Sequence, residues 1–212
     1  MTGCLSEQHS MKIPSIGPAM IGRRTWLGAA AAGLGAPSLW AAESEIPRVA
    51  LVIGNAAYPH QPLLNPVRDA LATSGLLRQM GFQVIEARDA GKTQMEAALA
   101  EARSMLQGRQ GIAMLYYAGH GLQMDWHNYL VPVDARLRSS GEVAAQTLSV
   151  GAVLQVFGQA ATRMNILVLD ACRDNPFPAV VSGQGLAPMD APTGTFFAYA
   201  TAPGNVAEDG SP

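Results

Sequence analysis

One histidine and one cysteine stand where they could carry out nucleophilic catalysis. His120 follows the apolar segment IAMLYY (112–117) and has a glycine on each side, and Cys172 follows the apolar residues 165–170. An imidazole can take the proton of a thiol and return it to a leaving amine, while the sulfur attacks a carbonyl carbon. Either residue alone is weak evidence, because a buried cysteine often packs as a small hydrophobe. Together they favour a catalytic pair, provided that the two segments are neighbouring strands.

Such a reaction also needs donors for the negative oxygen that develops on the substrate. The backbone N–H groups of Gly121 and Cys172 are candidates, because both follow the apolar segments at the expected site. Glycine next to His120 also permits unusual backbone angles and close approach by a substrate.

The segments that would position these residues alternate between apolar strands and amphipathic helices. Strands are expected at 48–54, 82–87, 112–117, 165–170 and 196–201, helices at 66–80, 93–106 and 150–157, and a hairpin between 121–124 and 128–131. This alternation is typical of an α/β fold with a mostly parallel sheet covered by helices on both faces. Ligands of such sheets bind beyond the carboxyl ends of the strands, where His120 and Cys172 would meet.

The composition indicates one globular domain and excludes several function classes. Of 212 residues, 49% are hydrophobic and 14% are charged, which suits a large buried core. A net charge of −2 without a basic block argues against nucleic-acid binding. The segment GNAAY (54–58) lacks the glycine-rich cradle of nucleotide-binding loops, and the two cysteines are too few for a thiolate metal site. No cofactor and no metal are therefore expected.

Residues 1–42 have the pattern of an export signal. Two adjacent arginines, Arg23 and Arg24, precede the uncharged, alanine-rich residues 25–42, which end in small residues suited to signal-peptidase cleavage. The pattern resembles a twin-arginine signal, which is an address read by a receptor rather than an anchor. We expect a separate domain over 43–212 that is periplasmic or secreted and contacts the membrane only during export.

Two motifs resemble those of the caspase-fold cysteine peptidases, in particular bacterial caspase-like and metacaspase-type proteins. They are YYAGHG (116–121) and LDACRDNPF (169–177), and supporting similarity comes from RVALVIGNAAY (48–58), LLNPVRDA (63–70), NYLVPVDA (128–135) and FFAYATAPG (196–204). The resemblance implies a three-layer α/β/α caspase-like fold and a cysteine endopeptidase that acts on proteins or peptides. It also implies a dyad of His120 and Cys172, with Gly121 and Cys172 forming the oxyanion hole.

The resemblance extends to the pocket for the residue before the cleaved bond, the S1 pocket. Asp170 lies two residues before the cysteine, as in metacaspases, where aspartate-specific caspases have glutamine. Asp69 lies where metacaspases carry their other acidic residue of this pocket. Two carboxylates would suit arginine or lysine in the substrate. Asp69 could equally be a solvated helix residue or a helix cap.

Two features keep other interpretations open. The chain ends at Pro212, soon after the fifth expected strand, whereas this fold normally adds a sixth strand and at least one helix. We therefore expect a domain without its last strand and helix, which keeps a non-catalytic caspase-like interaction or regulatory module as an alternative. A different α/β hydrolase using Cys172, such as an amidase or transpeptidase, would need an orienting acid near His120 that the sequence does not reveal. The oligomeric state is not predicted.

Overall fold

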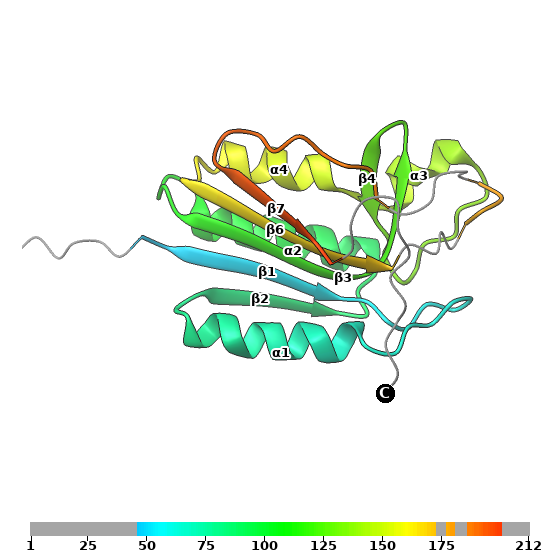
Figure 1. Cartoon of the computed structure of the whole chain (residues 1–212), viewed down its shortest axis with the longest axis horizontal. Helices are drawn as coiled ribbons and strands as arrows, with labels where there is room; N and C mark the ends of the chain where they lie inside the picture. Colours follow the sequence, from blue (N-terminus) through cyan, green and yellow to red (C-terminus); the bar gives the residue numbers. More distant parts are fainter. Residues whose placement is uncertain (1–45, 173–176, 181–185, 201–212) are drawn as a thin grey trace, which may run out of the picture. The chain divides into compact units, whose positions relative to one another are not determined.

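In the part of the chain that the structure describes, five parallel strands form the main sheet (Figure 1). β1 (Arg48–Gly54) lies between β2 (Gln83–Arg88) and β3 (Ile112–Met124), and β6 (Met164–Cys172) lies between β3 and β7 (Thr195–Tyr199). The order is thus β2–β1–β3–β6–β7, and the predicted mostly parallel sheet is confirmed.

The structure is a computed structural model that describes residues 46–172, 177–180 and 186–200, and only the backbone at Cys172. These residues belong to a compact unit that spans 43–212. The predicted export signal lies outside the described residues. Among the helices that are described, none is long and apolar enough to cross a membrane.

The third strand is longer than the sequence indicated. β3 pairs with β6 up to His120 and then turns to pair antiparallel with β4 (His127–Leu130), which in turn pairs with the short β5 (Leu148–Ser149). The hairpin was predicted, but the expected end of the strand at Tyr117 is wrong. The reason is that the glycine-rich segment after this residue changes the strand's partner without ending the strand. His120 therefore lies inside β3 and not after it.

Helices cover both faces of the parallel sheet, as predicted. They are α1 (Pro66–Gln79), α2 (Lys92–Leu106) and α4 (Val150–Gln159), and a short 3-10 turn (Ser140–Glu142) and α3 (Val143–Gln146) that the sequence analysis missed. Alternate residues of a strand point to opposite faces of the sheet, so the central strands contribute side chains to two separate cores. One lies under α1 and includes Val52 and Tyr116, whereas the other lies under α2 and α4 and includes Ile53 and Tyr117.

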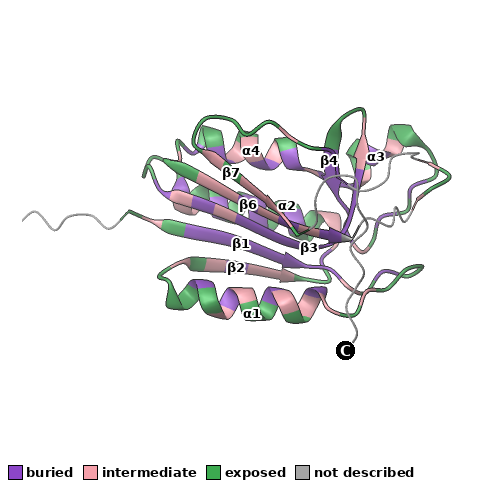
Figure 2. Ribbon diagram, in the orientation of Figure 1, coloured by how far each residue is buried: buried purple, intermediate pink, exposed green. Residues whose placement is uncertain are grey.

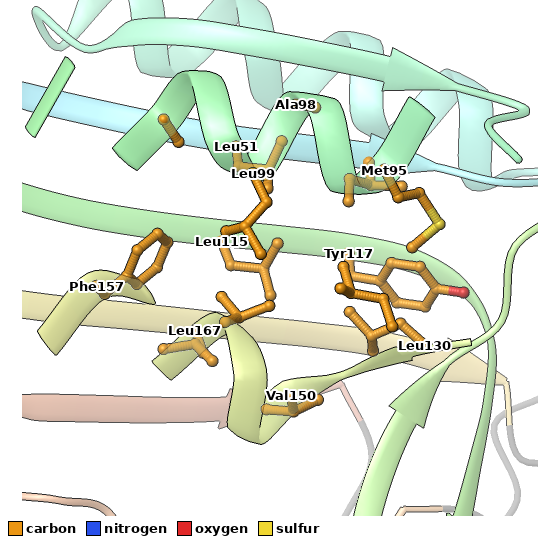
Figure 3. Packing of buried hydrophobic residues seen from close by; sticks show 14 of the residues in the cluster. Leu51, Met95, Ala98, Leu99, Leu115, Tyr117, Leu130, Val150, Phe157 and Leu167 are labelled. Atoms are coloured by element: carbon orange, nitrogen blue, oxygen red, sulfur yellow. The ribbon is translucent and has the colours of Figure 1, made fainter. Parts of the chain in front are cut away.

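The core under α2 and α4 is the larger of the two. Figure 3 shows Leu115 of β3 and Leu167 of β6 packed against Leu99 of α2 and Phe157 of α4. Figure 2 shows that β1 and β3 are buried along most of their length, whereas the edge strand β2 is more exposed. The strand β3, which carries His120, and its neighbour β1 are thus fixed by packing on both faces.

The α1 helix carries a buried polar group that the fold does not use. Ser74 is fully buried, and its hydroxyl makes no hydrogen bond with the described residues. A buried hydroxyl without a partner is destabilising, because it has lost its hydrogen bonds to water.

We expect Ser74→Ala to stabilise the protein by about 1 kcal/mol, because it removes the unpaired hydroxyl and alanine is the better helix former. Urea denaturation measures this change. The matched control is Ser104→Ala on α2, where an exposed hydroxyl donates to the Glu101 carbonyl oxygen at 2.8 Å. A Ser74→Ala protein that is less stable than the wild type would contradict the interpretation.

Candidate active site

Strand pairing brings the predicted histidine and cysteine together. In the parallel register of β3 and β6, His120 lies opposite Cys172. Neighbouring strands of a sheet are about 4.8 Å apart, so the two backbones are within reach of a shared substrate. The condition set by the sequence analysis, that the two segments be neighbouring strands, is met.

A main-chain carbonyl group orients the imidazole ring. His120 is 1% exposed, and its Nε2 lies 2.8 Å from the carbonyl oxygen of Gln61 in the loop between β1 and α1. A carbonyl oxygen only accepts, so Nε2 carries the proton in this hydrogen bond and Nδ1 is the basic nitrogen of the neutral ring. The Tyr58 ring packs against the imidazole, with ring centroids 4.4 Å apart.

The contact between His120 and the Gln61 carbonyl was not predicted from the sequence. Every residue has a carbonyl group, so no residue type marks Gln61 for the role. Predicting the contact would have required knowledge of the path of the loop 55–65, which depends on tertiary structure.

Two tyrosine hydroxyls hold the backbone of His120. Its N–H donates to the Tyr58 hydroxyl oxygen at 3.0 Å, and its carbonyl accepts from the Tyr117 hydroxyl at 2.6 Å. The Tyr58 hydroxyl in turn donates to the Val131 carbonyl at 2.9 Å, and the Val131 N–H donates to the His120 carbonyl at 3.0 Å. Every donor in this buried network has an acceptor, and the His120 carbonyl accepts from two of them, so the network fixes the point at which β3 leaves β6 for β4.

Gly119 is required by the same network. Its φ of +154° lies in a region that favours glycine, and a Cβ there would lie 2.7 Å from the Tyr58 hydroxyl oxygen and 2.8 Å from that of Tyr117. The sequence analysis attributed the glycines around His120 to approach by a substrate. At position 119, the close approach is made by the protein's own tyrosines.

The backbone of Gly121 is oriented by the hairpin. The Val131 N–H bonds to the His120 carbonyl, and hydrogen-bonded and non-hydrogen-bonded pairs alternate along an antiparallel ladder. The next pair, Gly121 with Leu130, is therefore non-hydrogen-bonded, and the N–H of Gly121 points away from β4. The oxyanion role of Gly121 and Cys172 stays a prediction.

The two acidic residues both act on one buried tyrosine. Tyr116 lies under α1, and its hydroxyl is 3.5 Å from Oδ2 of Asp170, the long limit for a hydrogen bond. Burial is the main cause that raises the pKa of Tyr116 to about 12; the charge of Asp170 comes next, a hydrogen bond with Thr73 opposes the shift, and the charge of Asp69 adds to it. Asp69 is half-buried in the first turn of α1. The structure thus places both carboxylates near Tyr116.

Among the described residues after β6, Ala187 is hydrogen-bonded to the hairpin. The Asn128 side-chain amide donates to the Ala187 carbonyl at 2.8 Å, and the Ala187 N–H donates back to its Oδ1 at 2.7 Å. Next to this contact, a Cβ at Gly121 would lie 2.8 Å from Leu186, so glycine allows the segment to pack against β3. No group of three or more histidine, cysteine or acidic side chains suited to a metal ion occurs in the ranges that the structure describes.

Comparison with known proteins identifies the family. The sequence model of the caspase domain matches residues 47–212. The chain belongs to the caspase domain family.

Individual relatives agree with this assignment. The chain is 35% identical over 128 residues to human mucosa-associated lymphoid tissue lymphoma translocation protein 1 and to its mouse homologue. The match covers 59% of this chain but only 15% of the length of these relatives. Among solved structures, the Drosophila initiator caspase Dronc superposes with a TM-score of 0.51 at 15% identity, over 74% of this chain and 56% of Dronc. The similarity to Dronc shows that the two chains share a fold.

The shifted tyrosine predicts how stability depends on alkaline pH. The folded protein holds the Tyr116 proton more tightly than the unfolded chain, whose tyrosines have an ordinary pKa of about 10. The stabilising contribution is therefore complete below pH 10 and is lost as the pH rises towards 12. Urea denaturation at pH 8 to 12 should show a fall in the free energy of unfolding that is smaller in Tyr116→Phe. Some dependence remains in the variant, because burial also raises the pKa of Tyr199. An equal fall in the free energy of unfolding of the wild type and of Tyr116→Phe would contradict a raised pKa at Tyr116.

Proposed function

We propose that this protein is a cysteine endopeptidase that cleaves peptide bonds after arginine or lysine. His120 is its general base and acid, and Cys172 is its nucleophile. The observation that carries the proposal is the β3–β6 register, in which His120 lies opposite Cys172.

The hydrogen bond to Gln61 supports the role of His120. With Nε2–H donated to a carbonyl oxygen, Nδ1 of the neutral ring accepts the thiol proton of Cys172. The resulting imidazolium keeps its Nε2–H bond, which gains strength when the donor is charged. This step needs no orienting carboxylate, because the Gln61 carbonyl already holds Nε2–H.

The reaction then follows the chemistry of an acyl-enzyme. The thiolate attacks the carbonyl carbon, and the backbone N–H groups of Gly121 and Cys172 donate to the resulting oxyanion. His120 gives its proton to the leaving amine as the C–N bond breaks, which leaves a thioester on Cys172. Water attacks the thioester with His120 as base, and the acid product and the thiol are released.

Two carboxylates on one face support the preference for basic residues. Asp170 precedes the cysteine by two residues on β6 and contacts Tyr116, and the charge of Asp69 on α1 raises the pKa of the same tyrosine. An arginine or lysine side chain would neutralise both charges, whereas an aspartate would be repelled by them.

The first test uses the full chain and fluorogenic peptides that end in arginine, lysine or aspartate. We expect hydrolysis after arginine and lysine and none after aspartate. Cys172→Ala should abolish hydrolysis, and His120→Ala should lower kcat/KM by about 10²- to 10⁴-fold, the usual worth of general acid–base catalysis. Cys4→Ser replaces the only other cysteine and serves as the matched control with unchanged activity.

Other results have distinct meanings. Cleavage after aspartate would keep the dyad and reject Asp69 and Asp170 as the specificity pair. A folded protein that cleaves none of the peptides would favour the interaction or regulatory module.

We also propose that residues 1–42 direct export to the periplasm or beyond the cell. Support comes from Arg23 and Arg24 ahead of the uncharged residues 25–42. In a bacterium with a twin-arginine pathway, the exported protein should begin at Glu43 by N-terminal sequencing. Replacement of both arginines by lysine keeps the charge and should retain the uncut form in the cytoplasm. Unchanged export of that variant would reject a twin-arginine signal.

A further inference from the structure

The two adjacent tyrosines of the YYAGHG motif serve opposite faces of the sheet. Tyr117 belongs to the core under α2 and α4 and bonds to the His120 backbone. Tyr116 belongs to the core under α1, and neither the dyad nor the oxyanion site uses it. A buried hydroxyl beside a carboxylate therefore has no role in the mechanism described so far.

Tyr116 lies beside the acidic residues that we propose for the S1 pocket. Its side chain is 9% exposed, and its hydroxyl faces Oδ2 of Asp170 on the neighbouring strand. On α1, Thr73 lowers the pKa of Tyr116 and the charge of Asp69 raises it. Asp69 and Thr73 are four residues apart on one helix and so lie on the same face, one turn from each other.

We propose that Tyr116 determines specificity by orienting the carboxylate of Asp170, so that the pocket binds the guanidinium of arginine better than the ammonium of lysine. This inference rests on the proposed function and adds to it a residue that sets the choice between the two basic side chains.

The direction of the hydrogen bond follows from the chemistry of its partners. A carboxylate oxygen only accepts, so the Tyr116 hydroxyl donates to Oδ2 of Asp170. The raised pKa of Tyr116 keeps its hydroxyl protonated, and hence a donor, throughout the neutral range. The charged groups that face it are Asp170 from β6 and Asp69 from α1, and both favour this neutral form.

The two substrates differ in how much they depend on that orientation. A guanidinium is planar and binds a carboxylate through two parallel hydrogen bonds, which requires the carboxylate plane to be fixed. A lysine ammonium is a compact charge with rotatable donors and tolerates a rotated carboxylate. Loss of the Tyr116 hydroxyl should therefore weaken binding of arginine more than binding of lysine.

The experiment compares Tyr116→Phe with wild type on peptides ending in arginine and in lysine. We expect kcat/KM for the arginine peptide to fall about tenfold, the usual effect of losing one hydrogen bond to a charged group. The fall should come mainly from a higher KM, and the lysine peptide should change about twofold or less, since a point charge needs no fixed plane. The matched control is Tyr129→Phe, which removes the hydroxyl of a tyrosine that is also 9% exposed.

The arginine-to-lysine ratio is a readout that a purely structural role would not move. An unchanged ratio in active Tyr116→Phe overturns the inference and leaves the proposed function standing. Thermal unfolding of both tyrosine variants shows whether lost activity reflects a lost fold.

A second measurement decides the matter without catalysis. Calorimetry with benzamidine, a small amidinium compound, measures binding to the pocket in the Cys172→Ala background. Weaker binding after addition of Tyr116→Phe supports the inference even if no peptide is cleaved. Equal binding, or no binding by either protein, overturns it.

Discussion

The parallel pairing of β3 with β6 is the constraint on which the candidate site depends. Leu115 lies opposite Leu167 and Tyr117 opposite Leu169, and all four side chains are buried in the same core. A slip of one residue would move these side chains to the other face, at the cost of their burial. The same register places His120 opposite Cys172, so the packing that stabilises the sheet also assembles the site.

A buried network of hydrogen bonds holds the backbone of β3 where the strand changes partner, which apolar packing alone does not do. Where β3 changes partner, its backbone groups leave the parallel ladder and need other partners. Tyr58 and Tyr117 supply them, and Asn55 adds side-chain bonds to the Ala90 backbone N–H and carbonyl at 2.9 and 3.3 Å. Loss of one member would leave buried groups unpaired at about 1–3 kcal/mol each. Stability and positioning of His120 thus rest on the same hydrogen bonds.

The sequence predicted the parts of the fold that local pattern encodes. Apolar runs and helical periodicity located the main strands and helices, and the His120 and Cys172 motifs indicated the family that the caspase domain match establishes. Pattern did not reveal that β3 continues through His120, because a glycine-rich segment usually ends a strand. Nor did it reveal that the Gln61 carbonyl contacts His120 or that Tyr116 contacts Asp170. Both depend on which surfaces meet in the folded chain.

The pairing of His120 with Cys172 can be tested through the pH dependence of Cys172 alkylation. The rate with iodoacetamide is measured in a Cys4→Ser background, with and without His120→Ala. We expect alkylation at neutral pH with a midpoint well below pH 8.5, and in His120→Ala we expect the midpoint to return to the ordinary thiol pKa of about 8.5. The same midpoint in both proteins would contradict the pairing.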